Sequence, residues 1–447
     1  MTSRAQRPFQ PSFERFEDRL VPTGNVVASV NGNILTLTGD VQGNQLLINQ
    51  IGLNQFLITG VNTGVNGVQN GSFVAANVSI LNASMFAGDD SIVFNTNNAP
   101  MLWNDIFIDG GLGNNTVQGT NMALIENLTV VNSFGNDQNK FTNLSVGGQV
   151  KFDNGDGDTT NSITRTASGF NSIGVGGLRI TNGVGFDQNT VLDTNSKGNV
   201  VITNGNGNAG TNQGAIDFLE VSLNASQQTV DGNVSFSTIS GHVTDVVDDT
   251  NVQGNVTYRY GSGQATESLG ANRLFAVPTI GGNVRIRGSG PASVFIGNDA
   301  LDSHHGVNIS GGVTIGTGGG DDAVTFTDAQ VKGSTAVQTS AGNDTVTIDT
   351  GRSAVGSTFG GNVFIGTSEG SDVVNIRATG TTTTTFQSHL HVDLGPSNDT
   401  LNLALSSKVF LNAAAPALFD GGTGTDALNV VLGNLVAVSP PLFVNFP

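Results

Sequence analysis

Residues 342–348 read Gly-Asn-Asp-Thr-Val-Thr-Ile, and they contain the pattern from which the fold can be predicted. After the acidic position its residues alternate between polar and apolar, which is the period of a β-strand. The same pattern, Gly-x-Asp-x-h-x-h with h apolar, recurs along the chain. Its acidic residues are Asp90, Asp322, Asp344, Asp372, Asp399 and Asp426, and Asn115 stands at the acidic position of a variant copy.

The spacing of these units predicts a repeat protein. The last five acidic positions follow one another at steps of 22, 28, 27 and 27 residues. A second marker is Gly-Asn-Val or Gly-Gly-Val, with Gly-Gln-Val at its first copy, and a step of 50 residues between its valines corresponds to two periods. Its valines are Val150, Val200, Val234, Val256, Val284, Val313 and Val363. Self-similarity at such a period is the signature of a solenoid or an array.

Short strands that recur once per coil lie parallel to their copies in the next coil. The sequence therefore predicts an all-β chain in which residues 86–432 form a parallel β-helix, or β-solenoid, with a right-handed coil as the expected hand. A β-propeller is the alternative, but propeller blades of about 40–50 residues fit the observed steps poorly.

The segments on either side of the repeats differ from them. Residues 25–85 show alternating stretches around Asn31-Gly32, which predicts β-hairpins that cap the first coil. Residues 433–447 are apolar, contain three prolines and carry no charge, which predicts a tail that covers the last coil or docks on a partner. Residues 1–24 hold four arginines and three prolines and are expected to be a disordered leader.

Composition narrows the classes of function. Of 447 residues, 62 are Gly and 12% are charged, and 35 acidic residues against 17 basic ones give a net charge of −18. Nucleic acid is disfavoured as a partner, because its recognition needs dense Lys and Arg. There is no cysteine, and therefore no disulfide or thiol chemistry. No apolar stretch is long enough to predict a transmembrane helix.

The leader carries a motif of its own. Residues 13–22 read Phe-Glu-Arg-Phe-Glu-Asp-Arg-Leu-Val-Pro. They resemble the LExLEDRxxP leader of many predicted surface proteins of planctomycete bacteria, with Phe in place of Leu twice. This resemblance implies an exported protein that is extracellular or lies at the cell surface.

A second resemblance concerns the acidic turns. Residues 421–429 read Gly-Gly-Thr-Gly-Thr-Asp-Ala-Leu-Asn, which matches the GGxGxDxhx unit of hemolysin-type calcium-binding (RTX) repeats at every fixed position. In that family, turn carbonyls and the aspartate bind Ca²⁺ between coils. The resemblance implies calcium at Asp90, Asp322, Asp344, Asp372, Asp399 and Asp426. The family's units follow one another directly in the sequence, whereas these units are isolated. The resemblance therefore does not imply the family's fold for the chain as a whole.

Each of these aspartates lies two and four residues before apolar residues of its strand, so its side chain should point to the same, interior side. An unpaired charge is costly there. Two hypotheses relieve that cost. In the first, a cation is held between successive turns. In the second, each carboxylate accepts hydrogen bonds from N–H groups of its own turn, a role in which an asparagine such as Asn115 would serve nearly as well.

Other polar residues are weaker candidates for a functional site. His304 and His305 stand in a Gly-rich segment beside acidic residues, where they are either a metal or acid–base cluster or a solvated loop. Arg285 and Arg287 alternate with apolar residues and form an outward basic pair that could bind an anionic sugar. Residues 381–385 are five threonines, which favour a strand.

These observations favour a secreted or cell-surface structural or adhesive β-solenoid, stabilised by calcium if its turns bind metal. Extracellular polysaccharide or other surface proteins are the expected partners. The alternative is a polysaccharide lyase or glycoside hydrolase, since parallel β-helices often host these activities. Such an enzyme needs clustered carboxylates and a basic residue on one open face, whereas these aspartates are spread one per coil. The sequence therefore leans away from an enzyme.

Overall fold

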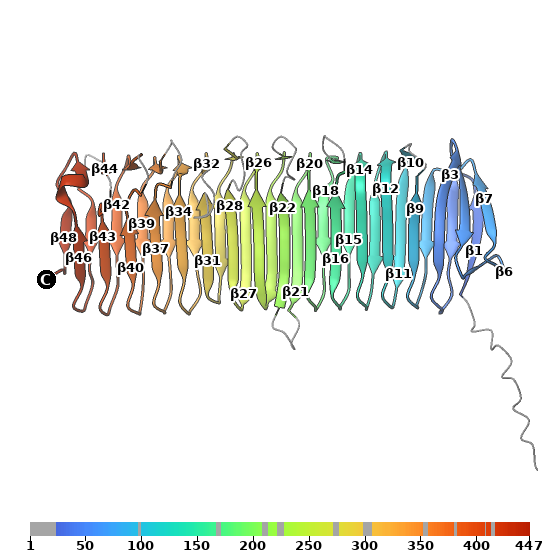
Figure 1. The fold of residues 1–447 in the computed structure, drawn as a ribbon, viewed down its shortest axis with the longest axis horizontal. Coiled ribbons are helices and arrows are strands. Elements are labelled where there is room, and N and C mark those ends of the chain that lie inside the picture. Colours follow the sequence, from blue (N-terminus) through green and yellow to red (C-terminus); the bar gives the residue numbers. More distant parts are fainter. Residues whose placement is uncertain are drawn as a thin grey trace, which may run out of the picture.

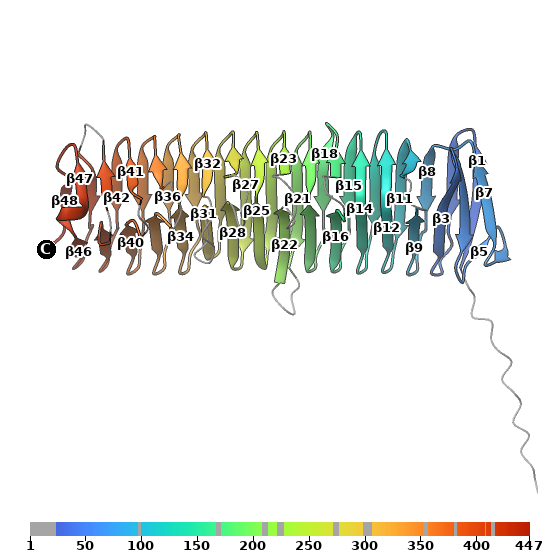
Figure 2. The same ribbon diagram turned by 45° about the horizontal axis from the view of Figure 1, so that its top comes forward.

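The computed structural model describes residues 24–447 except 97–99, 167–170, 208–212, 221–227, 271–276, 298–305, 352–355, 380–381, 407 and 413–415. The described residues form a rod whose strands lie side by side across its long axis (Figures 1 and 2). The only helix in this part of the chain is the single 3₁₀ turn η1 (Leu432–Asn434). No helix among the described residues has the length and apolar character needed to cross a membrane.

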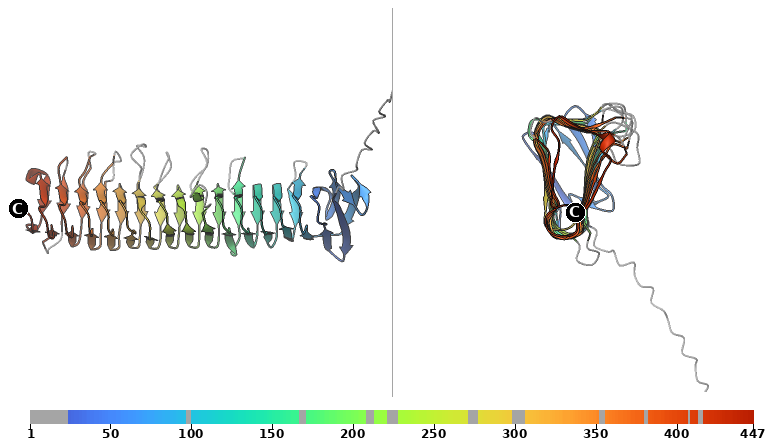
Figure 3. Two further views of the ribbon diagram at one scale, coloured as in Figure 1. Left: turned by 90° about the horizontal axis from the view of Figure 1, so that it is seen from below. Right: turned by 90° about the vertical axis from the view of Figure 1, so that its left-hand side faces the viewer.

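Each coil passes through three strands, so the rod has three faces (Figure 3, right). We call the three stacks of strands the first, second and third ladder. In one coil, β39 (Val363–Gly366) lies in the first ladder, β40 (Val373–Ile376) in the second and β41 (Thr384–Phe386) in the third. The chain then returns to the first ladder with β42 (Leu390–Asp393), which pairs with β39 in parallel. The predicted parallel β-solenoid is therefore confirmed.

The other strands of the three ladders follow the same order. The first ladder also holds β8 (Ile80–Ser84), β11 (Asp105–Gly111), β13 (Leu128–Asn132), β15 (Gln149–Asp153), β18 (Gly177–Thr181), β21 (Val200–Asn206), β24 (Val234–Ser240), β27 (Val256–Ser262), β30 (Val284–Gly288), β33 (Val313–Gly316), β36 (Thr335–Gln338), β45 (Leu418–Asp420) and β48 (Leu442–Val444). The second ladder also holds β9 (Ser91–Asn95), β12 (Thr116–Leu124), β14 (Gln138–Val146), β16 (Thr159–Thr164), β19 (Asp187–Leu192), β22 (Gln213–Glu220), β25 (His242–Asp248), β28 (Ala265–Gly270), β31 (Ala292–Gly297), β34 (Ala323–Thr327), β37 (Thr345–Asp349), β43 (Thr400–Leu403) and β46 (Ala427–Val430). The third ladder also holds β10 (Met101–Trp103), β17 (Asn171–Ile173), β20 (Thr194–Ser196), β23 (Gln228–Val230), β26 (Thr250–Val252), β29 (Thr279–Ile280), β32 (Val307–Ile309), β35 (Ala329–Val331), β38 (Thr358–Phe359), β44 (Val409–Leu411) and β47 (Leu435–Ala437). The long strands β12 and β14 pair in both the second and the third ladder.

The register of the second ladder aligns the acidic repeats from coil to coil. Residues two positions after each repeat aspartate pair with one another from coil to coil. The pairs are Val324–Val346, Val346–Val374, Val374–Leu401 and Leu401–Leu428. All of them are buried except Leu428, which is half-buried in the last coil. One interior column therefore runs through the C-terminal coils.

The second sequence marker labels the first ladder. Its valines pair in parallel, and each step of 50 residues contains one further coil, as predicted. Leu178 pairs with both Val150 and Val200, and Thr335 pairs with both Val313 and Val363. The coils that the marker skips are therefore ordinary members of the ladder with a different residue at the marked position.

The turn before each acidic residue brings successive coils into close contact. Gly342 has a φ of +147°, which L side chains rarely adopt. A Cβ atom on Gly342 would lie 2.3 Å from the carbonyl oxygen of Gly320 in the preceding coil. Glycine is required here because neither the conformation nor the space admits a side chain.

Antiparallel strands cover the N-terminal end of the rod, as the sequence predicts. Two hairpins are formed by β1 (Asn25–Asn31) with β2 (Ile34–Thr38) and by β3 (Gln45–Gly52) with β4 (Gln55–Gly60). The short strands β5 (Gly64–Val65), β6 (Val68–Gln69) and β7 (Ser72–Ala76) complete this cap. Strands β2 and β3 pair in parallel with β8 and β9, so they begin the first and second ladders.

The C-terminal residues extend the coil instead of lying across it. Strand β47 pairs with β44 and strand β48 pairs with β45, both in parallel. Phe443 of β48 stacks on Phe419 of β45, with ring centroids 5.2 Å apart. The apolar side chains of this segment therefore contribute to the interior of one more coil.

Candidate functional site

The six aspartates predicted as metal ligands lie in the turn between the first and second ladders, and each is at most 3% exposed. From Asp322 onward they follow one another coil by coil. The backbone N–H of each donates to Oδ1 of the next. These bonds join Asp322 to Asp344 (2.9 Å), Asp344 to Asp372 (2.8 Å), Asp372 to Asp399 (2.8 Å) and Asp399 to Asp426 (2.9 Å). We call this set the turn column.

The sixth aspartate belongs to the same column at the other end of the rod. The backbone N–H of Asn44 donates to Oδ1 of Asp90 at 2.7 Å, and that of Asp90 donates to Oδ1 of Asn115 at 3.3 Å. Each side chain thus binds the turn of the preceding coil. The hypothesis that it caps N–H groups of its own turn is wrong. The reason is that the neighbouring turn is only about 4.8 Å away, and its inward N–H would otherwise lack a partner.

Sequence reasoning missed two members of the turn column. Asp137 accepts a hydrogen bond from the backbone N–H of Asn115 at 2.8 Å, and Asp187 begins β19 one coil after β16. Both follow a glycine by two positions, as the motif requires. They were missed because the next inward residues are Asn139 and Asn189, where the motif demanded an apolar residue. The shorter motif Gly-x-Asp would have found both.

The second carboxylate oxygen, Oδ2, is buried in the turn column and often has no partner. Within the described residues, no hydrogen bond reaches this oxygen in Asp90, Asp137, Asp399 or Asp426. Asp322 differs, because its Oδ2 accepts a bond of 2.6 Å from the hydroxyl of Thr317. Burial raises the pKa of Asp90 to about 7 and that of Asp399 to about 6, although the N–H of the preceding turn opposes this.

Asn115 shows what a hydrogen donor does at the same position. Its Nδ2 donates to the carbonyl oxygens of Gly111 (3.3 Å) and Gly113 (3.1 Å) in its own turn. Carbonyl oxygens therefore face the δ2 atom, where they repel a charged carboxylate oxygen. A protonated carboxyl group can donate to them as the amide does. Among the described residues, no group of three or more His, Asp or Glu side chains is placed to hold a metal ion.

Some inward residues of the second ladder are polar in the middle of the rod. One column of residues, which pair in register from coil to coil, is apolar at Val117 and at Val294 and polar between them. Its polar members, each at most 1% exposed, are Asn139, Asn161, Asn189, Asp217, Asp245 and Glu267 in successive register. We call them the polar column. Along it, Nδ2 donates to the next Oδ1 from Asn139 to Asn161 (2.8 Å), from Asn161 to Asn189 (2.7 Å) and from Asn189 to Asp217 (2.7 Å).

A second row of amides on the first ladder interlocks with the polar column. Asn154 donates to Asn182 at 2.8 Å, and Asn182 donates to Asn204 at 2.7 Å. Bonds also cross between the rows, for example from Asn189 to Asn204 (3.2 Å) and from Asn204 to Oδ2 of Asp217 (2.8 Å). Together the two rows form a buried amide zipper, which sequence reasoning did not predict.

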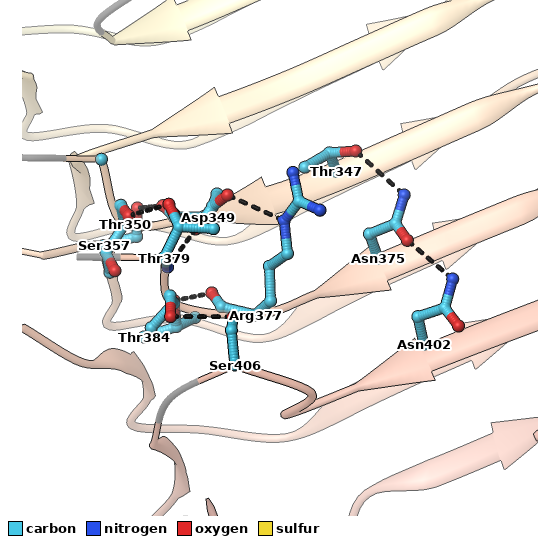
Figure 4. A network of polar contacts seen from close by, with 12 residues as sticks. Thr347, Asp349, Thr350, Ser357, Asn375, Arg377, Thr379, Thr384, Asn402 and Ser406 are labelled. Carbon is cyan, nitrogen blue, oxygen red and sulfur yellow. Dashed lines mark hydrogen bonds and ion pairs between the residues drawn. The ribbon is translucent and has the colours of Figure 1, made fainter. Parts of the chain in front are cut away.

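A further polar network lies at the corner between the second and third ladders (Figure 4). Asp349 accepts a 2.8 Å bond from Nε of Arg377 and another from the backbone N–H of Thr379, also at 2.8 Å. Thr384 is buried, and its hydroxyl donates to the carbonyl oxygen of Arg377 at 2.7 Å. The described part of the threonine run therefore turns one hydroxyl inward to the coil.

The remaining candidates are placed as follows. Arg285 and Arg287 are exposed on the outer face of β30, as their alternation predicts. His304 and His305 lie outside the described residues.

No protein-family model, no curated protein and no solved structure matches this chain. Its function is therefore inferred from its own geometry.

Proposed function

We propose that the protein is a structural or adhesive β-solenoid that works outside the cell or at its surface. One observation carries the proposal: ten carboxyl groups of the described residues, each with a pKa raised by burial, lie in the turn column or the polar column, inside the coil. They are Asp90, Asp137, Asp187, Asp217, Asp245, Glu267, Asp322, Asp344, Asp372 and Asp399. Buried groups of this kind hold coils together and do not meet a polymer on an outer face. The resemblance of residues 13–22 to a surface-protein leader supports the location.

The alternative, a polysaccharide lyase or glycoside hydrolase, needs perturbed carboxyl groups on an open face, within reach of the substrate. In this chain the perturbed groups are buried inside the coil, where they come from the turns and strand starts in the turn column and from the strands in the polar column. The placement of these acids thus favours the scaffold over the enzyme.

The outer face of the second ladder offers a regular row of small polar side chains. Nδ2 of Asn429 donates to Oδ1 of Asn402 at 2.8 Å, and Nδ2 of Asn402 donates to Oδ1 of Asn375 at 2.8 Å. Asn375 in turn donates at 3.3 Å to the hydroxyl of Thr347, which is buried and ends the accessible row (Figure 4). Such a row presents similar hydrogen-bonding groups at the strand spacing of about 4.8 Å, which suits a repetitive partner.

Three arginines gather on the outer face of the first ladder in this acidic protein. Arg259 pairs in register with Arg287 on the next strand, and Arg285 lies two residues before Arg287 on the same face. All three are exposed. On the following strand, the residues in register with Arg285 and Arg287 are Thr314 and Gly316, neither of them acidic. Since guanidinium groups bind carboxylates and sulfates in a bidentate fashion, we infer that the partner is an acidic polysaccharide.

A binding assay on immobilised polygalacturonate, with neutral dextran as reference, tests this function. The variant Arg259→Thr/Arg285→Thr/Arg287→Thr should lose about tenfold in affinity at low salt, as three exposed ion pairs of about 0.5 kcal/mol each would give. The variant Lys151→Thr/Arg179→Thr removes two charges from the same face elsewhere and should bind nearly as well as the wild type. Equal binding by the wild type and the triple variant would contradict the inferred partner.

Location is tested separately, on intact cells of the source organism. A surface protein should be cleaved by an added protease while cytoplasmic markers stay intact. Full protection from the protease, together with recovery in the soluble cell fraction, would contradict the proposal.

Calcium is a separable part of the proposal, supported by the buried Oδ2 atoms of the turn column. The geometry at Asn115 suggests one carboxylate oxygen and two carbonyl oxygens per turn, whereas calcium takes about six to eight oxygens. A bound ion would need further oxygens from the adjoining coil. If calcium binds, the wild type should melt higher in millimolar calcium than in EDTA, and Asp426→Asn should reduce that difference. Identical melting temperatures for both proteins in both buffers would rule this part out.

A further inference from the structure

Three carboxyl groups stack at the C-terminal end of the polar column. Asp217 pairs in register with Asp245, and Asp245 pairs with Glu267. All three side chains are completely buried. Asp217 accepts amide bonds from Asn189 (2.7 Å) and Asn204 (2.8 Å), but both carboxyl oxygens of Asp245 and both of Glu267 lack a donor. We call these three residues the acid stack.

The described residues around the acid stack supply no positive charge. The inward residues of the facing strands are Val234, Phe236 and Thr238 on β24 and Val256, Tyr258 and Tyr260 on β27. The hydroxyl of Tyr258 is occupied, because it donates to the carbonyl oxygen of Ser268 at 2.8 Å. The charged groups that act on the stack and its tyrosines from neighbouring positions are Asp187, Asp248 and Asp322. Among the described residues, every buried side chain that can carry a charge is acidic or a tyrosine.

We propose that the acid stack is a buried proton-binding site in which three carboxyl groups share two protons at neutral pH. Asp217 carries the negative charge, because two amide groups already donate to it. Asp245 and Glu267 carry the protons, and the O–H of each donates to a carboxyl oxygen of its neighbour in the stack. No covalent bond other than O–H forms or breaks. The stack thereby continues the hydrogen-bonded column by two more coils.

The electrostatics agree with this geometry. Burial is the main cause that raises the pKa of all three groups. For Asp245, the charges of Glu267 and Asp217 add to that effect. Carboxyl groups titrate near pH 4 in an unfolded chain, so the folded protein holds the protons more tightly. The stabilising contribution is therefore fully present below about pH 4 and is lost as the pH rises through the raised values of the folded state.

Glu267 gives a direct measurement of the protonation state. The chain has six glutamates, and Glu267 is the one that is buried among those the structure describes. With glutamate labelled by ¹³C at its side-chain carboxyl group, infrared spectroscopy at pH 7 should show one neutral carboxylic acid. That signal should vanish in Glu267→Gln. A wild-type spectrum at pH 7 with ionised glutamates alone would overturn the proposal, whether or not the variant folds.

The consequence for stability is tested with the amide variant Asp217→Asn/Asp245→Asn/Glu267→Gln, in which the column carries no titratable group. Hydrogen-exchange protection of β22, β25 and β28, corrected for intrinsic rates, should fall about tenfold or more in the wild type between pH 6 and pH 9, since one pKa unit is a tenfold factor. The amide variant should show little change. As a matched control, Asp344→Asn alters the turn column and should leave the pH response of these three strands intact. An equal pH response in wild type and amide variant would overturn the proposal.

A cation in place of the protons would give the opposite results. Glu267 would be ionised at pH 7, and protection of β22, β25 and β28 would fall when EDTA is added at constant pH. Either result would overturn the assignment of protons to the acid stack.

Discussion

The same interior column of the second ladder is apolar in the C-terminal coils and polar in the middle coils. From Val294 to Leu428 each residue packs on an apolar neighbour, and from Asn139 to Glu267 each meets a polar one. Both stretches use the same strand register. In a parallel solenoid, therefore, the main partner of an inward side chain is its counterpart one coil away, at about 4.8 Å.

This rule explains which polar residues can fill the column. An amide has both donors and acceptors, so a run of asparagines satisfies itself when each donates to the next. A charged carboxylate has acceptors only, and it ends such a run unless a proton makes it a donor. The polar column follows this order, with amides first and acids last, before it becomes apolar again at Val294.

The largest loss of stability is expected from a substitution within the amide zipper. Asn161 donates to Asn182 (3.2 Å) and Asn189 (2.7 Å), and it accepts from Asn139 (2.8 Å) and Asn154 (3.2 Å). Asn161→Leu removes all four bonds and leaves buried amide groups short of partners. At about 1–3 kcal/mol for each orphaned group, we expect a loss of about 4 kcal/mol or more in local stability. Hydrogen exchange in β14, β16 and β19 measures it.

Ile163→Val is the matched control on the same strand, because it trims the neighbouring apolar column by one methylene group. It should cost about 1 kcal/mol. If Asn161→Leu reduced stability less than Ile163→Val does, the amide zipper would make no net contribution to the stability of the coil.

The converse substitution should have the next largest effect. Val346→Asn places a lone amide between Val324 and Val374, where no neighbour can bond with it. The expected cost is about 3 kcal/mol, from an unsatisfied buried amide and lost apolar burial. Exchange protection of β34, β37 and β40 reports the change.

A triple variant tests whether a continuous ladder of amides is more stable than isolated amides. With asparagine at positions 324, 346 and 374 together, the amides could donate to one another as Asn139, Asn161 and Asn189 do. The cost should then be clearly less than the sum of the three single substitutions. Strict additivity would show that a ladder of amides gains nothing from its continuity.

Much of the architecture could be predicted from the sequence, because the signals are local. Alternation after each acidic residue gave the strands, and the recurrence of Asp322, Asp344 and Asp372 gave the coil length. The hydrogen bond from each turn to the next coil's carboxylate could not be predicted in this way. Its partners are a full coil apart in the chain, and only the register of the ladder brings them together.

The amide zipper could not be predicted from the sequence for a related reason. It joins residues of different ladders, such as Asn154 and Asn161, which face each other only once the coil has closed. The motif with an apolar residue after Gly-x-Asp also excludes the coils of Asp137 and Asp187, whose inward residues are Asn139 and Asn189. The recurrence of asparagine at this inward position is itself a signal of the repeat.

The smallest expected effect concerns the turn column, where Asn115 already replaces an aspartate. In Asp344→Asn, Oδ1 keeps its bond to the N–H of Asp322, and Nδ2 gains turn carbonyls as Asn115 does. Burial raises the pKa of Asp344, so its contribution to stability is present below about pH 4 and declines as the pH rises. We therefore expect Asp344→Asn to equal the wild type near pH 4 and to exceed it by about 1 kcal/mol at pH 8, the net value of one hydrogen bond. Thermal melts at both pH values measure this, with Asp344→Ala as the control that leaves the N–H of Asp322 without a partner and destabilises at both. If the asparagine variant lost as much stability as the alanine variant at pH 8, the charge of Asp344 would have a use in the turn that an amide cannot supply.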